Sequence, residues 1–372
     1  MIKTGLDPLA DLAVFLEPFG SLVHRAQSRP ALERYTTGLL ADLCRKTAPD
    51  LGRAVAGTNG QRLQEFLTNT PWDSDAMDRM RVQHMVAQAS AGLGVQIIDD
   101  TGFAKKGTHS VGVARQYSGT LGRVDNCQVV VTSHYVDRSI DWPIAARLYL
   151  PESWTQNDDR LRGAKVPLST TFKTKGEIAL ELIDAGIAAG VPTEAVLADA
   201  GYGDQPSFLE GLETRALPHI VGVASTVRFR PVQEVELDSG EEILPTYRGS
   251  GRPRRARRLE DRVPGREASA LLDALPEDDW PTIRWREGTK GNLVKRFARL
   301  PVYRVGQRGK HLPTRGWLIG EGPRPSHQGE SKYFFAWGLD SRSLHDLVTL
   351  AHCRWVIERF YQDAKGELGL DD

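Results

Sequence analysis

The sequence predicts an α/β (α+β) protein in which a core of strands and helices follows a helical N-terminal domain and is interrupted by a β-rich insertion. Three observations predict this fold class. Apolar residues repeat at helical spacing up to about residue 90, and short apolar runs separated by turn residues follow. Arg, Pro and Gly then become frequent between about 225 and 330. The predicted divisions are therefore 1–90, 91–225, 226–330 and 331–372.

Composition limits the possible classes of protein. The 372 residues include 48 Lys plus Arg and 48 Asp plus Glu, so the formal net charge is zero. This excludes a uniformly basic nucleic-acid-binding surface but allows a local basic patch. The three cysteines form no Cys-x-x-Cys pair, so neither a zinc ribbon nor a disulfide framework is supported. This use of cysteine fits a protein of the reducing cytosol. No apolar run approaches the ~20 residues that a membrane span needs, and acidic residues interrupt any signal-peptide core. We expect a soluble cytoplasmic protein.

The N-terminal 90 residues predict helices. One helix is expected around an apolar face formed by Leu32, Tyr35, Leu39 and Leu43. A second follows Pro71-Trp72, with Asp73 or Ser74 as its N-cap and Met77, Met80 and Met85 as its apolar stripe. Core packing is the simplest interpretation of these stripes. The domain could also bind DNA or dimerise, although no Arg-rich recognition helix stands out.

The core is expected to begin with three strands at about 95–98, 110–117 and 128–135, which form an antiparallel meander. A helix over 175–189 follows and ends at Gly190 and Pro192. Further strands are predicted at 196–198 and 220–223, and, after the insertion, at 333–337. A final helix from about Ser343 carries Glu358. This order of elements is typical of an RNase H-like core.

Three acidic residues stand at the ends of apolar runs or within the final helix: Asp100, Asp199 and Glu358. Carboxylates that converge from two strands and a helix suit a pair of Mg²⁺ ions that cleave phosphodiesters. Singly, each has a simpler interpretation, because Asp100 and Asp199 could cap helices or turns and Glu358 could be a surface acid. Asp99 and Asp100 point to opposite faces of a strand. We choose Asp100 as the metal ligand, with Asp99 as the second option.

One rival motif is weaker. Asp100-Thr101-Gly102 and Asp238-Ser239-Gly240 match the tripeptide of aspartic proteases, whose two acids share a proton in one cleft. Three glutamates surround the second tripeptide, which resembles a charged hairpin tip. No Walker loop, His-Glu-x-x-His or Gly-x-Ser-x-Gly motif is present.

Two sets of cations are candidates for DNA contact. The run 248–258 resembles a partial AT-hook suited to a narrow minor groove, or else a solvated loop that touches only phosphates. Its candidate DNA-binding residues are Arg252, Arg254, Arg255, Arg257 and Arg258. Arg354 and Lys365 share one helical face with Glu358 and could clamp phosphates. Alternatively, Arg354 and Glu358 form a surface ion pair worth ~0.3–0.5 kcal/mol.

Together these residues resemble the DDE transposases of bacterial insertion sequences, also called DDE superfamily endonucleases. The resemblance rests on Asp99-Asp100-Thr101-Gly102-Phe103-Ala104-Lys105-Lys106-Gly107, continued to Gly119, on Leu197-Ala198-Asp199-Ala200-Gly201-Tyr202-Gly203, and on Arg354-Trp355-Val356-Ile357-Glu358. It implies an RNase H-like catalytic core in which Asp100, Asp199 and Glu358 hold two Mg²⁺ ions, for which Mn²⁺ can substitute.

The resemblance also implies the reaction and its partners. The expected activity is cleavage of insertion-sequence ends, followed by transfer of the 3′-hydroxyl into target DNA. The substrates are double-stranded terminal inverted repeats and target DNA, held by a homodimer. Two departures are visible: Ala351 stands where related transposases have a Tyr, and the family pattern continues beyond residue 372. An inactive, truncated DNA-binding relic and a plain metal-dependent nuclease are therefore the alternatives.

Overall fold

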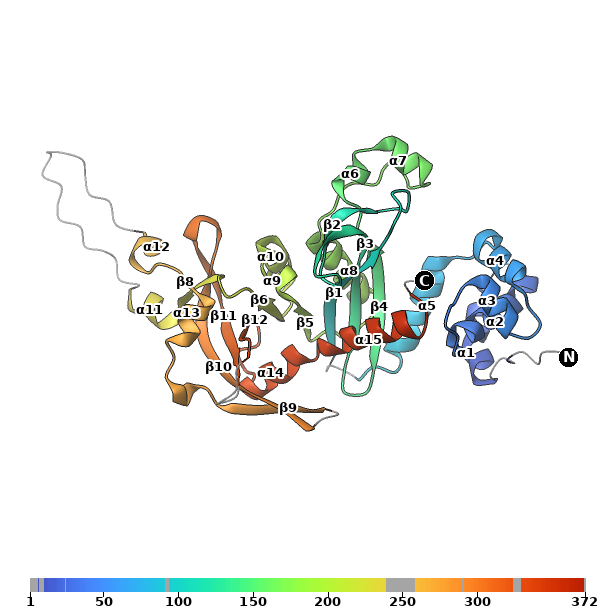
Figure 1. The fold of residues 1–372 in the computed structure, drawn as a ribbon. Helices are drawn as coiled ribbons and strands as arrows, with labels where there is room; N and C mark the ends of the chain where they lie inside the picture. Colours follow the sequence, from blue (N-terminus) through green and yellow to red (C-terminus); the bar gives the residue numbers. More distant parts are fainter. Residues whose placement is uncertain are drawn as a thin grey trace, which may run out of the picture.

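The computed structural model describes residues 6, 10–23, 25–90, 94–238, 258–288, 291–323 and 329–370. Within these residues one mixed sheet runs through the protein, in the order β2-β3-β1-β5-β6-β12-β11-β10-β7-β8, with β4 beside β3 and β9 beside β10 (Figure 1). Its strands are β1 Val95–Ala104, β2 Ala114–Ser118, β3 Arg123–Val136, β4 Asp141–Leu148, β5 Ala195–Ala198, β6 His219–Val223, β7 Arg228–Pro231, β8 Arg266–Glu267, β9 Thr282–Gly288, β10 Gly291–Val305, β11 His311–Gly322 and β12 Lys332–Trp337.

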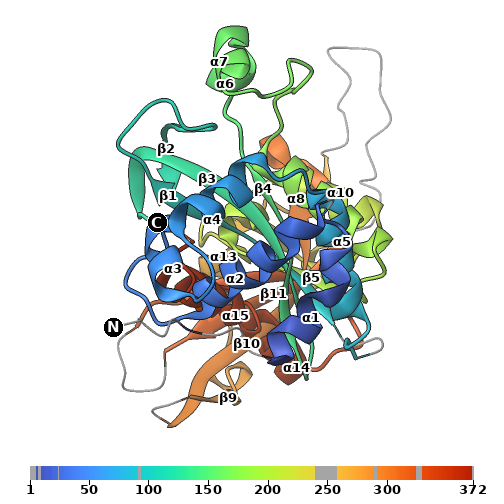
Figure 2. The same ribbon diagram turned by 90° about the vertical axis from the view of Figure 1, so that its right-hand side faces the viewer.

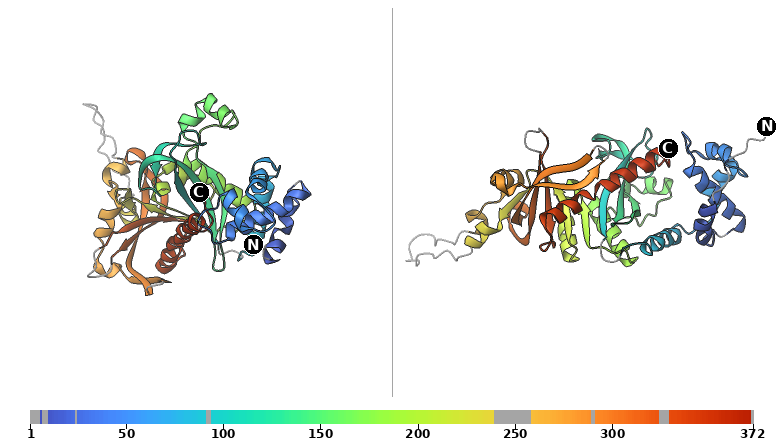
Figure 3. Two further views of the ribbon diagram at one scale, coloured as in Figure 1. Left: turned by 45° about the vertical axis from the view of Figure 1, so that its right-hand side comes forward. Right: turned by 90° about the horizontal axis from the view of Figure 1, so that it is seen from below.

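The described residues up to 90 form helices, as the sequence predicts. They are α1 Ala10–Gly20, η1 Ala26–Ser28, α2 Arg29–Leu40, α3 Ala48–Ala54, α4 Gly60–Asn69 and α5 Ser74–Val86. Asp73 caps α5 by accepting a hydrogen bond from the Ala76 N–H. The α5 helix joins this unit to the core, because Arg81 donates to the carbonyl groups of Pro143 and Ile144 in β4. Figure 3 shows α1–α4 beside the core, with α5 leading into it.

The core contains an antiparallel group and a parallel group of strands. The β3 strand pairs antiparallel with both β1 and β4, whereas β5 pairs parallel with β1 and β6. The expected strand at 110–117 is the shorter β2, which pairs with the start of β3 rather than with β1. The sequence analysis missed β4, which is the third antiparallel strand beside β1 and β3.

Short helices follow β4 and β5. They are α6 Glu152–Thr155, α7 Asp158–Gly163, α8 Lys175–Ala188, α9 Ala200–Gly203 and α10 Pro206–Thr214. The α8 helix closely matches the predicted helix at 175–189. A capping box of Thr174 and Glu177 starts it, and Gly190, at φ +87°, follows its end.

The two faces of the sheet are covered by different helices. Ile98, Val196 and Ala198 pack with α8 in one buried cluster. Val95, Ile97 and Leu197 pack with the final helices in another cluster on the opposite face. Alternation along β1 therefore decides which helix each side chain meets.

The insertion extends the same sheet. Its helices are α11 Val232–Leu237, α12 Leu259–Arg262, α13 Ala268–Asp273, η2 Glu277–Asp279 and η3 Gln307–Gly309. It holds the long β10 and β11 strands, where only short strands were expected. The chain returns to the core through β12, which pairs antiparallel with β6 (Figure 1). In the view of Figure 2, β9 of the insertion extends below α15 (Trp355–Gly366). The predicted divisions at about 90, 225 and 330 stay predictions.

The expected single final helix is two helices, α14 Leu344–His352 and α15 Trp355–Gly366. Between them the backbone tightens, since the Val356 N–H donates to the Cys353 carbonyl and the Ile357 N–H to that of Arg354. Such i→i−3 bonds mark a 3₁₀-like turn that re-aims the second helix. Glu358 lies in the first turn of α15. In the described residues, no helix is long and apolar enough to cross a membrane.

A buried ion pair joins the core to the insertion. Arg304 of β10 lies 2.8 Å from Glu213 of α10, and the two side chains are only 7% and 16% exposed. Removing one member leaves the other charge buried without a partner, which is strongly destabilising. This pair therefore fastens α10 against the long strand.

We predict that Arg304→Ala lowers the free energy of unfolding by about 3–5 kcal/mol, because it leaves Glu213 buried without its partner. Urea unfolding followed by circular dichroism measures this loss. Arg162→Ala, which removes a cation from exposed pairs, is the matched control and should cost less than about 1 kcal/mol. Equal losses in the two variants would contradict the prediction.

Candidate active site

Asp99 lies on the face of the sheet that α15 covers. It lies two residues after Ile97 on β1 and therefore shares its face, and Ile97 packs in the cluster of the final helices. In the parallel pairing of β1 with β5, Ile98 is opposite Ala198. One residue further along each strand, Asp99 and Asp199 are neighbours, and the Asp199 charge acts on the Asp99 carboxyl. These two acids therefore come together at the end of β5.

Arg354 joins three acids. Its guanidinium donates to Asp99 at 2.6 Å and to Glu358 at 3.3 Å. The negative charges of Asp99, Asp199 and Glu358 all raise the pKa of Arg354, although burial, the largest effect, opposes them. The site thus gathers three carboxylates from β1, β5 and α15 around one cation.

Asp100 faces the other way. Its carboxylate accepts a hydrogen bond at 2.9 Å from Lys175, at the start of α8, in a largely buried ion pair. Strand alternation predicts opposite faces for Asp99 and Asp100, but it cannot say which face α15 covers. Lys175 was missed because no sequence pattern links a helix start to a strand 75 residues earlier.

The protonation of Asp99 reflects its surroundings. Burial raises the pKa of this carboxyl to about 7. The Arg354 charge opposes the rise, and the Asp199 charge adds to it. An acid with this pKa is partly protonated near neutral pH, so a small change in its surroundings changes its charge.

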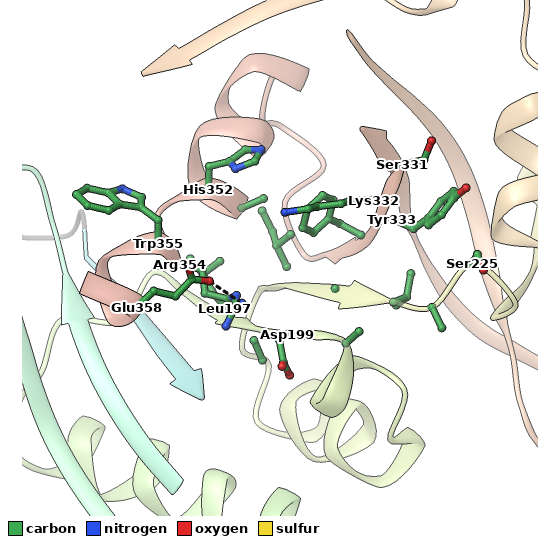
Figure 4. A pocket seen from close by; sticks show the side chains of 18 residues that line it. Leu197, Asp199, Ser225, Ser331, Lys332, Tyr333, His352, Arg354, Trp355 and Glu358 are labelled. Atoms are coloured by element: carbon green, nitrogen blue, oxygen red, sulfur yellow. Dashed lines mark hydrogen bonds and ion pairs between the residues drawn. The ribbon is translucent and has the colours of Figure 1, made fainter. Parts of the chain in front are cut away.

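Asp199 lines a cavity. Its side chain caps α9 by accepting from the Tyr202 N–H at 3.3 Å, so the helix-capping interpretation also holds. The cavity measures about 560 Å³ and is bounded by Asp199, Arg354 and Glu358 on one side and by Ser225 and Lys332 on another. Figure 4 shows these side chains and the contact between Arg354 and Glu358. Lys332, which belongs to β12, has no signal in the sequence.

The donor atoms at this site suit a hard divalent cation, since they are carboxylate oxygens gathered from separate elements. Among the described residues, however, no three His, Cys, Asp or Glu side chains are close enough to hold an ion as they stand. The positive charge of Arg354 lies among these acids. The site thus fits Mg²⁺ or Mn²⁺ in the kind of donor atom it offers, which is carboxylate oxygen.

The insertion holds the α14–α15 junction. His352 lies 3.1 Å from Glu321 of β11 and stacks on Trp285 of β9. Burial alone would raise the pKa of Glu321, but the His352 and Lys295 contacts outweigh it and lower the pKa to about 2. These contacts fix the helix start from which Arg354 and Glu358 project.

The predicted DNA-binding residues have varied surroundings. Arg354 forms the predicted ion pair with Glu358 and a second one with Asp99. Lys365 reaches along α15 to the Gly102 carbonyl at 3.3 Å and the Phe103 ring at 4.9 Å. Arg258 directly precedes α12. The remaining candidates, Arg252, Arg254, Arg255 and Arg257, lie outside the described residues.

Comparisons with known proteins identify the family of this chain. A family model for "DDE superfamily endonuclease" matches residues 18–292, which is most of the chain. The chain belongs to this family. The match includes Asp99, Asp100 and Asp199 but ends before Glu358.

A curated relative, described as a probable transposase for insertion sequence element IS701 of Microchaete diplosiphon, is 30% identical over 251 residues. These residues are 67% of this chain and 63% of the relative, so the chain spans less than two thirds of that protein. Among solved structures, the NurA nuclease of Sulfolobus solfataricus matches with a TM-score of 0.28 and 10% identity, over 75% of this chain and 80% of its own. A likeness this weak carries no argument.

We predict that Arg354→Leu, in EDTA at pH 8, lowers the free energy of unfolding by about 2–3 kcal/mol, because it leaves the Asp99 charge without a partner. This loss is smaller than the loss expected when a fully buried ion pair is broken. At pH 5 the Asp99 carboxyl is protonated in the folded protein, so the loss should be clearly smaller. Denaturant titrations at both pH values measure it, with the exposed Arg359→Leu as control. A loss that does not depend on pH would contradict this account.

Proposed function

We propose that this protein is a DDE transposase that cleaves the ends of an insertion sequence and joins the 3′-hydroxyl to target DNA. The single observation that supports it best is the gathering of Asp99, Asp199 and Glu358 around Arg354. We further infer an RNase H-like core, because β1, β3 and β4 are antiparallel, α8 follows, and β5 then pairs parallel with β1 and ends at Asp199.

We infer that Asp99, Asp199 and Glu358 hold the metal ions, with Asp99 in the position for which the sequence alone favoured Asp100. Asp99 shares its face with α15, whereas Asp100 is paired with Lys175. Two divalent ions would activate the attacking water or hydroxyl and stabilise the leaving oxygen. Metal binding requires ionised carboxylates, so Asp99 must lose its proton first.

The chain's own cations prepare the site for a phosphodiester. Arg354 balances the negative charge of the three acids. Bound metal ions would take over this role, and the guanidinium could then contact a phosphate. Guanidinium and phosphate oxygens form strong, charge-assisted hydrogen bonds. Lys365 carries its charge further along α15, and the 248–258 run would add backbone contacts. Two chains are needed to hold two element ends, so we propose a homodimer on DNA.

The first test is cleavage of a labelled duplex that carries the element's ends, with Mg²⁺ or Mn²⁺ and with EDTA as control. We predict that Asp199→Asn and Asp99→Asn each reduce nicking at least a hundredfold, because each removes a charged metal ligand, whereas binding to the duplex persists. Asp100→Asn should retain measurable nicking. The reverse result for Asp99 and Asp100 would restore Asp100 as the ligand.

The same assay separates the alternatives. Joined products distinguish a transposase from a plain nuclease. An intact protein that binds the ends but never nicks them, with either metal, would contradict the proposal and indicate a DNA-binding relic.

We predict that the affinity for Mn²⁺ rises about tenfold from pH 6 to pH 8. The folded-state pKa of Asp99 is raised to about 7, so its carboxyl is mostly protonated at pH 6 and mostly ionised at pH 8, and only the ionised form binds metal. Calorimetric titration of the unliganded protein measures the affinity, and Asp99→Asn should remove most of the dependence. An affinity that is flat over this range would contradict the role of Asp99.

A further inference from the structure

The segment 105–113, between β1 and β2, has no part in the chemistry described so far. It belongs to the long motif that follows Asp99, and it carries Lys105, Lys106 and His109. Lys106 through Ser110 are exposed to solvent. The chain nevertheless holds this loop in place with side chains from several elements. Anchoring of this kind is what an exposed loop needs if it is to bind a partner in a fixed geometry.

The carbonyl groups of the loop are turned inward. Asn126 of β3 donates to the carbonyls of Lys105 and Gly107, and Gln128 donates to that of Val111. Arg160 of α7 reaches the Thr108 carbonyl at 3.2 Å. The buried Trp154 indole donates to the carbonyl of Val113 at 2.8 Å. Nearly every acceptor of the loop is therefore used by the protein itself.

Most backbone N–H groups of the loop, in contrast, have no hydrogen-bond acceptor among the described residues. Within the described part of the chain, none of the backbone N–H groups of residues 106–112 donates a hydrogen bond to the protein. Neither Lys105 nor Lys106 has an ion-pair partner among the described residues. Carbonyl groups used by the protein, N–H groups without a protein partner and two ammonium groups make this exposed loop electropositive, and backbone N–H groups of this kind can bind anions.

The loop continues the face that holds the candidate active site. Along β1, alternation brings Asp99, Thr101, Phe103 and Lys105 to the same side of the strand. Lys105 is about six residues beyond Asp99, which is ~20 Å at ~3.3 Å per residue. Between them lies Lys365, whose ammonium contacts the Gly102 carbonyl and the Phe103 ring. The cations Arg354, Lys365 and Lys105 therefore follow one line away from the acids.

We propose that the loop 105–113 binds the phosphate backbone of the DNA strand that leads away from the scissile phosphate. Lys105 at the end of the line of cations, Lys106 next to it and the N–H groups of the exposed residues 106–110 are the contacts. This proposal rests on the proposed function, since it takes the acids as the point of cleavage. The line of cations matches a polyanion better than a single free phosphate. The loop offers charges and N–H donors but no aromatic platform of its own, so we expect contacts that do not depend on base sequence.

The test is the salt dependence of binding to two labelled duplexes, one with the element's ends and one of unrelated sequence. For Lys106→Gln, the slope of log K against log salt should fall by about 0.9, which corresponds to about eightfold weaker binding near 0.1 M salt. Both duplexes should lose the same factor. Arg138→Gln, at the β3–β4 turn on the opposite end of the strands, is the control and should change nothing.

A second variant separates the built loop from its charge. Asn126→Ala keeps both lysines but releases the carbonyls of Lys105 and Gly107, so it should also weaken binding, by at least threefold, with an unchanged thermal midpoint of the core. Unchanged affinity in Asn126→Ala would overturn the role of the backbone. An unchanged salt slope in Lys106→Gln would overturn the site.

Metal-dependent nicking, measured on the same preparations, keeps the two proposals apart. Wild type that nicks while Lys106→Gln binds normally leaves the proposed function standing and removes the loop site. Wild type that never nicks, while Lys106→Gln loses one phosphate contact, supports the loop and contradicts the cleavage function.

Discussion

The arrangement of the site depends on charge compensation by Arg354. Three carboxylates from β1, β5 and α15 lie near its guanidinium. The Asp99 side chain is only 14% exposed, and a mostly buried negative charge is costly without a counter-charge. One guanidinium contacts two of these acids and acts on the third. The contact therefore does structural work, because it fastens α15 to β1 across more than 250 residues of chain.

The insertion supports the same helix from the other side. His352, Trp285 and Glu321 form one contact, and Arg286 stacks on the Trp355 ring at 3.7 Å as a second. Both lie beside the tightened turn between α14 and α15. The direction in which Glu358 projects is therefore set by residues of β9 and β11, far from the acids in sequence. The insertion thus contributes to the geometry of the site even where it supplies no ligand.

Local signals account for what the sequence predicts well. The helix over 175–189 with its end at Gly190, the apolar runs of β1 and β5 and the N-cap at Asp73 each depend on neighbours a few residues away. The face of Asp99, the partner of Lys175 and the break before α15 depend on contacts between distant elements, which one sequence does not reveal. The β4 strand was missed because Pro143 and the charged residues around it weaken its alternating pattern.

The passage of the chain from β6 through the insertion and back along β12 has a consequence for how the protein could change in evolution. Because β11 of the insertion is hydrogen-bonded to β12 of the core inside one continuous sheet, the insertion is not a separable module that could be lost or exchanged at its two junctions. Its removal would leave β12, with its buried Phe335 and Ala336, as an open sheet edge that invites aggregation. Descendants of this chain are thus expected to retain the insertion as a whole while its outer turns vary.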